Sequence, residues 1–538
     1  MISCGSWLAH LLDAYGVRHV FGIPGVHNVE LYRGLPSTRI RHVSPRHEQG
    51  AGFMADGYAR STGKPGVAFV ITGPGLTNIA TAMGQAYADS VPMLVIAAVN
   101  KRHQLGLGRG YLHEMPNQAN LASGLSAFTH TLLRPQELPD VLAAAFSMFS
   151  SSRPRPVVIE IPIDVMEEKV EVALPPPAAG RLSSPGPDPD AIMAAVALLS
   201  AAKRVLLIAG GGAQGAAAEV TMLAERLGAA VVLTQNARGL LASNHPQLAD
   251  FGIARDDGRV SADEAEVVIA IGTEMGETDF NFYSSRRFAV RNSFVRIDID
   301  PRQIAIGQLP DIGIVSDARL ACAALIAGLA NRNGVAPDLP WMISTVAALS
   351  QTAGIGRGEA LDPLYQMLLD AITDASPGLI LVGDSTKPAY RGLFTYRAPK
   401  PRSFFSAATG YGTLGYALPA AIGAKVAHPD RPVIALVGDG GAQFTFPELM
   451  SAREAEAGIV MIIWNNSGYG DIRDYMVSKE IAPIAVDPIA PDFVKSAEAM
   501  GVAAMRVDTL DQLAAALRGH HRSAKVPLLI EAGPWLKG

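Results

Sequence analysis

Cysteine is almost absent from this chain of 538 residues, which contains only Cys4 and Cys322. Two cysteines so far apart argue against a disulfide framework or a cysteine-bound metal cluster, and they favour a reducing compartment. An excess of one charge sign is also missing, because 45 basic and 50 acidic residues leave a formal net charge of −5. This balance gives no electrostatic reason to expect a nucleic acid or an anionic membrane as a partner.

Long hydrophobic runs are missing as well, although 49% of the residues are apolar. No stretch approaches the roughly 18 unbroken apolar residues typical of a membrane-spanning helix. The first residues lack a basic region followed by an apolar core, and Ser6 to Tyr15 instead has the spacing of an amphipathic helix. We therefore expect a cytoplasmic protein without a membrane partner.

Proline and glycine mark two breaks in the chain. Residues 173–190 are too rich in proline to hold a helix or an inner strand, and a weaker break runs from about 331 to 362. Between the breaks, short runs of Val, Ile and Leu alternate with helical patterns, which is typical of parallel sheets covered on both faces by helices. The sequence predicts an α/β fold of three tandem doubly wound parallel-sheet domains, at residues 1–172, 190–332 and 358–538.

The middle segment contains a pattern that often signals a dinucleotide site. Residues 210–215 follow an apolar run and have the spacing G-x-G-x-x-G. Such a site also needs an acidic residue at the end of the next strand, to hold the ribose hydroxyls. Here that strand, expected at 230–234, ends in Gln235 and Asn236. Tight packing of a strand against a helix is therefore the better explanation of these glycines.

A more specific pattern lies near the C-terminal end. Gly438-Asp439-Gly440 follows the apolar run 432–437, and Asn465-Asn466 follows a second run, 459–464. Carboxylate, amide and carbonyl oxygens at two strand ends suit Mg²⁺ that also holds phosphate groups. The glycines let the backbone approach a diphosphate, and a helix expected to start near Thr445 would point its N-terminus at it. The double Asn at this distance favours such a site over a plain turn.

These two motifs resemble those with which thiamine diphosphate (ThDP) enzymes anchor their cofactor. Residues 21–28, 46–60, 72–78 and 412–419 also look like the decarboxylase and acetolactate synthase group, so the likeness extends over nearly the whole chain. It implies a pyrimidine-binding domain, a central Rossmann-like domain and a diphosphate-binding domain, in that order. The central domain holds FAD in acetolactate synthases. No motif of this sequence clearly indicates a flavin site, so we expect no FAD here.

The resemblance implies a role for each matching residue. Glu48 stands where the family has the glutamate that protonates the aminopyrimidine ring; the simpler interpretation is that it begins a helix and interacts with the helix dipole. Leu414 matches the apolar residue that bends the cofactor, unless it is an ordinary core leucine, and the carbonyl of Gly412 would accept a hydrogen bond from the cofactor amine. The remaining matches are the metal ligands Asp439, Asn466 and Gly468 and the diphosphate contacts Gly440, Gly441, Ala442, Ser385 and Thr386. Ser385 and Thr386 could equally cap a helix.

The expected substrate pocket departs from familiar members of the family. Val26 stands where pyruvate decarboxylases carry Asp and benzoylformate decarboxylases carry Ser, and Thr72 stands near a catalytic histidine of the latter. Two usual proton donors are therefore replaced. His27 and His113 are the available catalytic substitutes, although either could be a surface or hydrogen-bonded structural residue.

Acidic residues suggest the substrate. Glu274, Glu277 and Asp279, called the acidic loop below, follow the strand expected at 267–271, in a region that borders the active site of related enzymes. Paired carboxylate oxygens suit a planar guanidinium group, although a solvated loop would have the same composition. As a whole the sequence resembles the 5-guanidino-2-oxopentanoate decarboxylases of arginine catabolism.

We therefore expect an enzyme that uses ThDP and Mg²⁺ to convert a 2-oxo acid to an aldehyde and CO₂, with 5-guanidino-2-oxopentanoate as its substrate. The alternatives are an acetolactate-synthase-like carboligase or another ThDP-dependent lyase, and a cofactor-binding protein without activity. In the family, the domain of Glu48 meets the diphosphate domain of a neighbouring subunit, so we expect a homodimer or a tetramer built from two dimers. The sequence leaves open the exact substrate, the outcome of the reaction, a nucleotide in the middle domain, and dimer against tetramer.

Overall fold

The computed structural model describes residues 1–176, 180, 182–249, 261–280, 289–331, 335–351, 362–520 and 524–537. They form two compact units, the first from residues 1–182, 380–386 and 406–537 and the second from residues 183–379 and 387–405. Residues 332 and 358, at which we predict domain boundaries, lie outside the described residues. In the described part of the chain, no helix has both the length and the apolar composition needed to cross a membrane.

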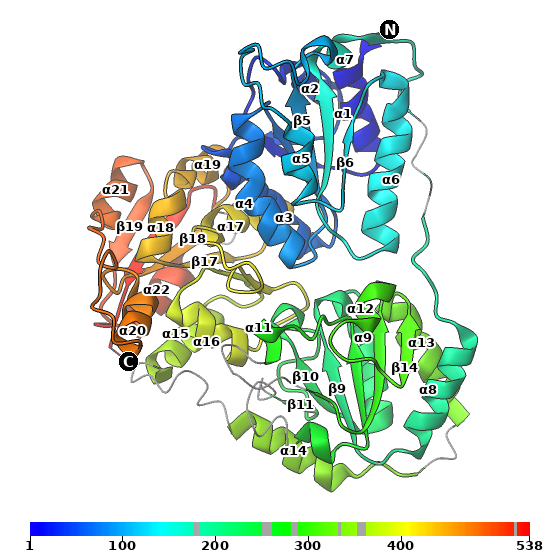
Figure 1. The fold of residues 1–538 in the computed structure, drawn as a ribbon. Helices are drawn as coiled ribbons and strands as arrows, with labels where there is room; N and C mark the ends of the chain where they lie inside the picture. Colours follow the sequence, from blue (N-terminus) through cyan, green and yellow to red (C-terminus); the bar gives the residue numbers. More distant parts are fainter. Residues whose placement is uncertain are drawn as a thin grey trace. The chain divides into compact units, whose positions relative to one another are not determined.

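The N-terminal part of the first unit, drawn in blue to cyan in Figure 1, contains a six-stranded sheet. Its strand order is β3-β2-β4-β5-β7-β6, and every pair is parallel. Its strands are β2 (His19–Gly22), β3 (Arg41–Val43), β4 (Gly66–Val70), β5 (Met93–Val99), β6 (Phe128–Thr131) and β7 (Val157–Pro162). A separate antiparallel pair joins β1 (Ile2–Ser3) to β8 (Lys169–Val170).

Helices cover both faces of this sheet because successive strand residues point to opposite sides. Val67 and Phe69 of β4 lie in one core with Leu8 of α1 and Leu142 of α6. Helix α3 contributes no residue to that core and packs against β4 and β2 from the other face. The helices are α1 (Cys4–Ala14), α2 (Val29–Tyr32), α3 (Glu48–Thr62), α4 (Pro74–Ala88), α5 (Gln118–Ser123), α6 (Leu138–Ser151) and α7 (Ile163–Glu167).

The C-terminal part of the chain forms a second six-stranded sheet in the order β16-β15-β17-β18-β20-β19, with β15, β17, β18, β20 and β19 paired in parallel. The strands are β15 (Ile380–Gly383), β16 (Phe404–Ser406), β17 (Val433–Gly438), β18 (Val460–Trp464), β19 (Ala503–Arg506) and β20 (Leu528–Ala532). The helices are α17 (Ala417–Ala427), α18 (Asp439–Thr445), α19 (Glu448–Glu454), α20 (Gly470–Ser478), α21 (Phe493–Ala499) and α22 (Leu510–Gly519). Because β15, β17 and β18 are neighbours, the loops that follow them share one edge of the sheet.

Two glycines allow the N-terminal and C-terminal sheets of the first unit to pack through their helices. A Cβ atom on Gly57 of α3 would lie 2.0 Å from the carbonyl oxygen of Ala420 in α17. One on Gly423 of α17 would lie 1.9 Å from the carbonyl oxygen of Met54. Both distances are far below a normal contact, so α3 and α17 touch backbone to backbone only because neither glycine has a side chain.

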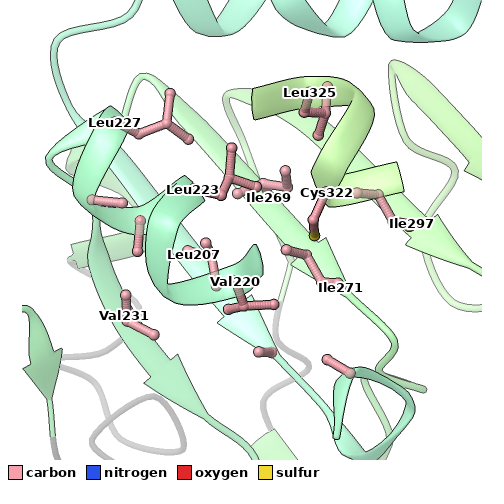
Figure 2. Packing of buried hydrophobic residues seen from close by; sticks show 14 of the residues in the cluster. Leu207, Val220, Leu223, Leu227, Val231, Ile269, Ile271, Ile297, Cys322 and Leu325 are labelled. Carbon is pink, nitrogen blue, oxygen red and sulfur yellow. The ribbon is translucent and has the colours of Figure 1, made fainter. Parts of the chain in front are cut away.

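The second unit contains a third six-stranded sheet, in the order β11-β10-β9-β12-β13-β14 and parallel throughout. Figure 2 shows its core, in which side chains of the sheet such as Leu207 and Ile269 pack against Leu223 of α9 and Cys322 of α13. The strands are β9 (Val205–Ala209), β10 (Ala230–Leu233), β11 (Leu248–Ala249), β12 (Val267–Ile271), β13 (Ser293–Asp298) and β14 (Ile312–Val315). The helices are α8 (Pro189–Ala201), α9 (Ala217–Leu227), α11 (Glu277–Phe280), α12 (Pro301–Ala305), α13 (Ala318–Gly328), α14 (Leu339–Gln351), α15 (Asp362–Ala375) and α16 (Lys387–Thr395).

Close packing explains why glycines follow β9. A Cβ atom on Gly210 would lie 2.3 Å from the carbonyl oxygen of Gly272, and one on Gly212 would lie 3.0 Å from the Cα atom of Gly272. The loop after β12 therefore approaches this turn closely. This contact supports the packing interpretation of the G-x-G-x-x-G pattern.

Candidate active site

The predicted metal ligands meet at the carboxyl edge of the C-terminal sheet. Asp439 is the first residue of α18, directly after β17, and is 1% exposed. Its carboxylate accepts hydrogen bonds from the N–H of Asn466 at 3.2 Å and of Gly468 at 2.8 Å. Burial raises the pKa of Asp439, while these N–H donors act in the opposite direction. The parallel pairing of β17 with β18 brings the two motifs together.

The side-chain amide of Asn466 completes this arrangement. One end of the amide lies 2.9 Å from both the carbonyl oxygen of Gly468 and Oδ1 of Asp439. With its nitrogen at that end, the amide donates a hydrogen bond to each oxygen. With its oxygen there, three oxygens converge and require a cation between them. One carboxylate, one amide and one carbonyl oxygen fit Mg²⁺ whose other ligands are phosphate oxygens and water.

The helix that follows the metal motif starts earlier than we predict. Helix α18 begins at Asp439 and ends at Thr445, so the expectation of a helix that starts near Thr445 is wrong. Glycine is a poor helix former, but close packing overrides that preference here. A Cβ atom on Gly440 would lie 2.6 Å from the ring of Tyr469, and one on Gly441 would lie 3.1 Å from Oδ1 of Asp384.

This earlier start changes the predicted diphosphate contacts. The first N–H groups of a helix have no acceptor within it, and Gly440 and Gly441 supply two of these groups. Ala442 is the fourth residue of the helix, so its N–H can already reach the carbonyl of Gly438. Gly440 and Gly441 are therefore better placed than Ala442 to donate to a diphosphate.

Ser385 and Thr386 follow β15 at the same edge. The Ser385 hydroxyl donates to the carbonyl of Thr413 at 3.3 Å, and the Thr386 hydroxyl oxygen would lie 3.1 Å from a Cβ atom on Gly438. Both side chains thus point to parts of the predicted cofactor site. Their role as diphosphate contacts stays a prediction.

Asp384, for which the sequence predicts no role, is fully buried. Its carboxylate accepts hydrogen bonds from the N–H groups of Ser385 at 2.8 Å, Gly415 at 3.2 Å and Ala417 at 3.0 Å. Burial raises its pKa to about 6 despite these bonds. Asp384 thereby ties the turn after β15 to residues 409–416, called the 409–416 loop below. An acidic residue directly after an apolar strand is the only signal the sequence offers for it.

Gly412 and Leu414, the residues expected to face the aminopyrimidine ring, lie in this loop. Gly412 is exposed and has a φ angle of 74°, a conformation that favours glycine. Leu414 is half-buried, unlike the fully covered leucines of the core. Between them, Thr413 is buried. The loop therefore exposes the two predicted cofactor contacts on either side of an anchored residue.

Glu48 is the first residue of α3 and is 9% exposed. Its Oε2 accepts a hydrogen bond from Nδ2 of Asn78 in α4 at 2.9 Å. A carboxylate in the first turn of a helix also interacts favourably with the helix dipole. The structure thus agrees with both interpretations of Glu48, and it adds Asn78 as the side chain that orients the carboxylate.

A second buried glutamate holds the start of α3 from the C-terminal part of the first unit. Glu448, 1% exposed, accepts hydrogen bonds from the N–H groups of Arg46 at 3.0 Å and His47 at 3.2 Å. It also accepts one from the Ser451 hydroxyl at 2.6 Å. Burial raises its pKa. Because Arg46 and His47 immediately precede Glu48, Glu448 fixes the chain at the point where the predicted catalytic residue begins.

His27 and His113, far apart in sequence, are neighbours in the structure. Their ring centroids are 5.1 Å apart at an interplanar angle of 71°. Nδ1 of each ring and the hydroxyl of Thr72 are buried and have no hydrogen-bond partner among the described residues. Burial and the proximity of His113 lower the pKa of His27. The two histidines therefore form a polar pair whose Nδ1 atoms could bind a substrate.

The acidic loop belongs to the second unit. Glu274 and Glu277 are exposed and Asp279 is partly buried. The backbone carbonyl of Glu274 accepts hydrogen bonds from the buried guanidinium of Arg296 at 3.1 Å and from Gln303 at 3.1 Å. The backbone at Glu274 is therefore fixed, and Glu277 and Asp279 lie in the short helix α11 rather than in the expected loop.

Three sequence models of one family match most of the chain. The model described as "Thiamine pyrophosphate enzyme, N-terminal TPP binding domain" matches residues 2–121, the one for the central domain matches residues 192–325, and the one for the C-terminal TPP binding domain matches residues 382–532. The first match contains the strands of the N-terminal sheet except β6 and β7, the second contains the whole sheet of the second unit, and the third contains the C-terminal sheet except the first two residues of β15. The fold predicted from the sequence is confirmed.

Named relatives match between 86% and 98% of the chain. It is 44% identical over 531 residues to the probable 2-ketoarginine decarboxylase AruI of Pseudomonas aeruginosa, covering 98% of this chain and 93% of that protein. It is 31% identical over 471 residues to the acetolactate synthase isozyme 1 large subunit of Escherichia coli, covering 86% and 82% of the two chains. The acetolactate synthase of Arthrospira platensis is 31% identical over 526 residues, with 92% and 88% covered.

Proposed function

The chain belongs to the thiamine pyrophosphate enzyme family, and we propose that it is a ThDP- and Mg²⁺-dependent decarboxylase of 5-guanidino-2-oxopentanoate, also called 2-ketoarginine. The observation that carries the substrate proposal is the 44% identity, over almost the full length of both chains, to a probable 2-ketoarginine decarboxylase. The cofactor proposal rests on the meeting of Asp439, Asn466 and Gly468 beside the first turn of α18.

We propose that the two sheets of the first unit have different roles in catalysis. In the C-terminal sheet, Asp439, Asn466 and the carbonyl of Gly468 would hold Mg²⁺, and Gly440 and Gly441 would donate to the diphosphate. When bound, ThDP supplies a thiazolium carbon that adds to the 2-oxo group and a ring that accepts the electrons left by CO₂.

Side chains of the helices and loops around the N-terminal sheet would transfer protons. Glu48, oriented by Asn78, would share a proton with the aminopyrimidine ring. Formation of an aldehyde ends with protonation of carbon, which a carboligase must avoid at the same step. The half-buried pair of His27 and His113, whose Nδ1 atoms have no partner in the described part of the chain, would deliver that proton, and this proposed role supports decarboxylation rather than carboligation.

The acidic loop would recognise the guanidinium group by pairing carboxylate oxygens with its N–H donors. Its position at the carboxyl end of β12 supports this role, because ligands of parallel sheets bind at that edge.

The proposal is tested by the release of CO₂ from a panel of 2-oxo acids, with and without added ThDP and Mg²⁺. The panel contains 5-guanidino-2-oxopentanoate, its neutral isostere 5-ureido-2-oxopentanoate, and pyruvate. We expect the guanidinium substrate to be preferred and an aldehyde to form. A hydroxyketone from pyruvate would support the acetolactate-synthase-like alternative, which the 31% identical relatives make the second candidate. No CO₂ from any acid would refute both.

We also propose that the active enzyme is a dimer or a tetramer of two dimers with a closed two-fold interface. The proposal rests on the family resemblance, in which the domain of Glu48 completes the site of a neighbouring subunit. Light scattering during turnover tests it, and an active monomer would contradict it.

A further inference from the structure

The 409–416 loop is held by side chains of α4 and of Asp89, the residue that follows this helix, as well as by its own sheet. The backbone N–H and the hydroxyl of Thr413 both donate to Oε1 of Gln85, at 3.2 Å and 2.9 Å. The hydroxyl of Thr409 donates to Oδ2 of Asp89 at 2.6 Å. Gln85 is fully buried and Thr409 and Thr413 are each 7% exposed. Because these side chains are buried, water cannot easily reach them and take the place of these hydrogen bonds.

The α4 side of this contact is itself fixed by a buried network. Oδ2 of Asp89 also accepts hydrogen bonds from Nε2 of Gln85 at 2.5 Å and from Nη2 of Arg60 at 2.6 Å. Arg60 pairs with the buried Asp56 at 2.7 Å, and Asp56 accepts a hydrogen bond from the hydroxyl of Tyr416 at 2.5 Å. The network thus contacts the loop at its beginning, its middle and its end.

Close packing adds to the hydrogen bonds. A Cβ atom on Gly84 would lie 2.5 Å from Cζ of Tyr411, so the tyrosine ring rests directly on the backbone of α4. One on Gly410 would lie 3.3 Å from Cβ of Ala88. The loop and α4 fit without space for an additional methyl group at Gly84.

We propose that Gln85 is a positioning residue that acts through Thr413 to set Gly412 and Leu414 against the cofactor. Thr413 is the buried residue between the two predicted cofactor contacts, so fixing its backbone N–H and its hydroxyl fixes the peptide groups on both sides. Asp89 holds the amide of Gln85 in the orientation that leaves Oε1 for Thr413. The inference rests on the use of ThDP in the proposed function, but it does not depend on the identity of the 2-oxo acid.

The test compares Gln85→Met, Thr413→Val and Thr413→Ser with a matched control, Thr395→Val. Thr395 is similarly buried at 8% exposure, and its hydroxyl also makes one hydrogen bond, to the carbonyl of Arg391 at 3.0 Å. Two quantities are measured: amide hydrogen exchange of the 409–416 loop in the protein without cofactor, and exchange of the thiazolium proton in deuterated water after ThDP and Mg²⁺ are added.

We expect Gln85→Met to speed amide exchange in the loop and to slow thiazolium exchange, each about tenfold, since a net hydrogen bond corresponds to roughly that factor. Thr413→Val should show the same changes to a smaller extent, Thr413→Ser should restore both values, and Thr395→Val should alter neither.

Unchanged amide exchange in the Gln85 and Thr413→Val variants would overturn the proposal. Faster amide exchange with normal thiazolium exchange would also overturn it, because the contact would then be structural only. If Gln85→Met fails to fold, the comparison of Thr413→Val with Thr413→Ser decides. Both readouts are taken without substrate, so a wrong substrate assignment leaves the result unaffected.

Discussion

Removing the carboxylate of Glu448 should loosen the start of α3 and slow the enzyme. In the Glu448→Ala variant, the N–H groups of Arg46 and His47 and the hydroxyl of Ser451 lose their acceptor. The carboxylate also fills the space beside Gly50, where a Cβ atom would lie only 2.2 Å from Oε1. The substitution therefore both removes hydrogen bonds and leaves a void beside Gly50.

The size of the effect can be worked out from these contacts. A hydrogen bond to a charged group contributes about 1.5–3 kcal/mol, and such contributions are not additive. Burial raises the pKa of Glu448, which shows that desolvation offsets part of the gain. We expect the alanine variant to lose about 3–5 kcal/mol of unfolding free energy. Glu448→Gln keeps an acceptor for the two N–H groups and should lose about 1–2 kcal/mol.

Glu454→Gln is a matched control because Glu454 binds the side chain of the same Arg46, at 2.6 Å, but is 58% exposed. A surface ion pair contributes about 0–1 kcal/mol. Urea unfolding of the protein without cofactor gives the differences, provided that the denaturant slope stays constant between variants. The thiazolium exchange rate should fall about ten- to a hundredfold in Glu448→Ala, since small displacements of catalytic groups have effects of that order.

An unfolding midpoint for Glu448→Ala equal to that of Glu454→Gln would refute the reasoning, because the buried contacts would then stabilise no more than an exposed pair. A large loss of stability with normal thiazolium exchange would refute the link from Glu448 to the position of Glu48.

Further outcomes are expected from the predicted site. Asp439→Ala should abolish measurable ThDP binding in isothermal titration, since a metal ligand and its charge disappear together; unchanged affinity would remove the metal-site assignment. Glu48→Gln should keep the fold and bind ThDP but slow thiazolium exchange by roughly a hundredfold or more, the loss expected for a general acid or base, and a normal rate would contradict its role. Converting the acidic loop to amides should raise KM for the guanidinium substrate by about ten- to a hundredfold and leave the ureido isostere little changed, as expected for a charge-assisted hydrogen bond of about 1.5–3 kcal/mol; an unaltered preference would show that the loop only faces solvent. Burial lowers the pKa of His19 from 6.5 to about 4, so the neutral ring contributes stability that is complete above about pH 6.5 and is lost as the pH falls toward 4. His19→Gln should therefore flatten the fall in unfolding free energy between about pH 7 and pH 5, and an identical slope in both proteins would show that His19 does not titrate in this range.

The sequence by itself determined the fold class and the spacing of the predicted metal motif. Short apolar runs that alternate with helical patterns require parallel sheets covered on both faces, and the three sheets have that form. Asp439 and Asn466 could be paired in advance because each lies within two residues of a strand end, and neighbouring parallel strands end at one edge. Their meeting needs no information beyond the order of strands and turns.

Only the tertiary structure decided how the site is held in place. Gln85 and Thr413 are separated by 328 positions and Arg46 and Glu448 by 402, so no local pattern relates them. Helix propensity could not predict the start of α18 either, because glycine disfavours a helix. Gly440 and Gly441 are nevertheless required there, since the residues packed against them leave no space for a side chain. Local chemistry selects which side chains can bind a metal or a proton, whereas their positions depend on contacts that exist only after distant helices have packed.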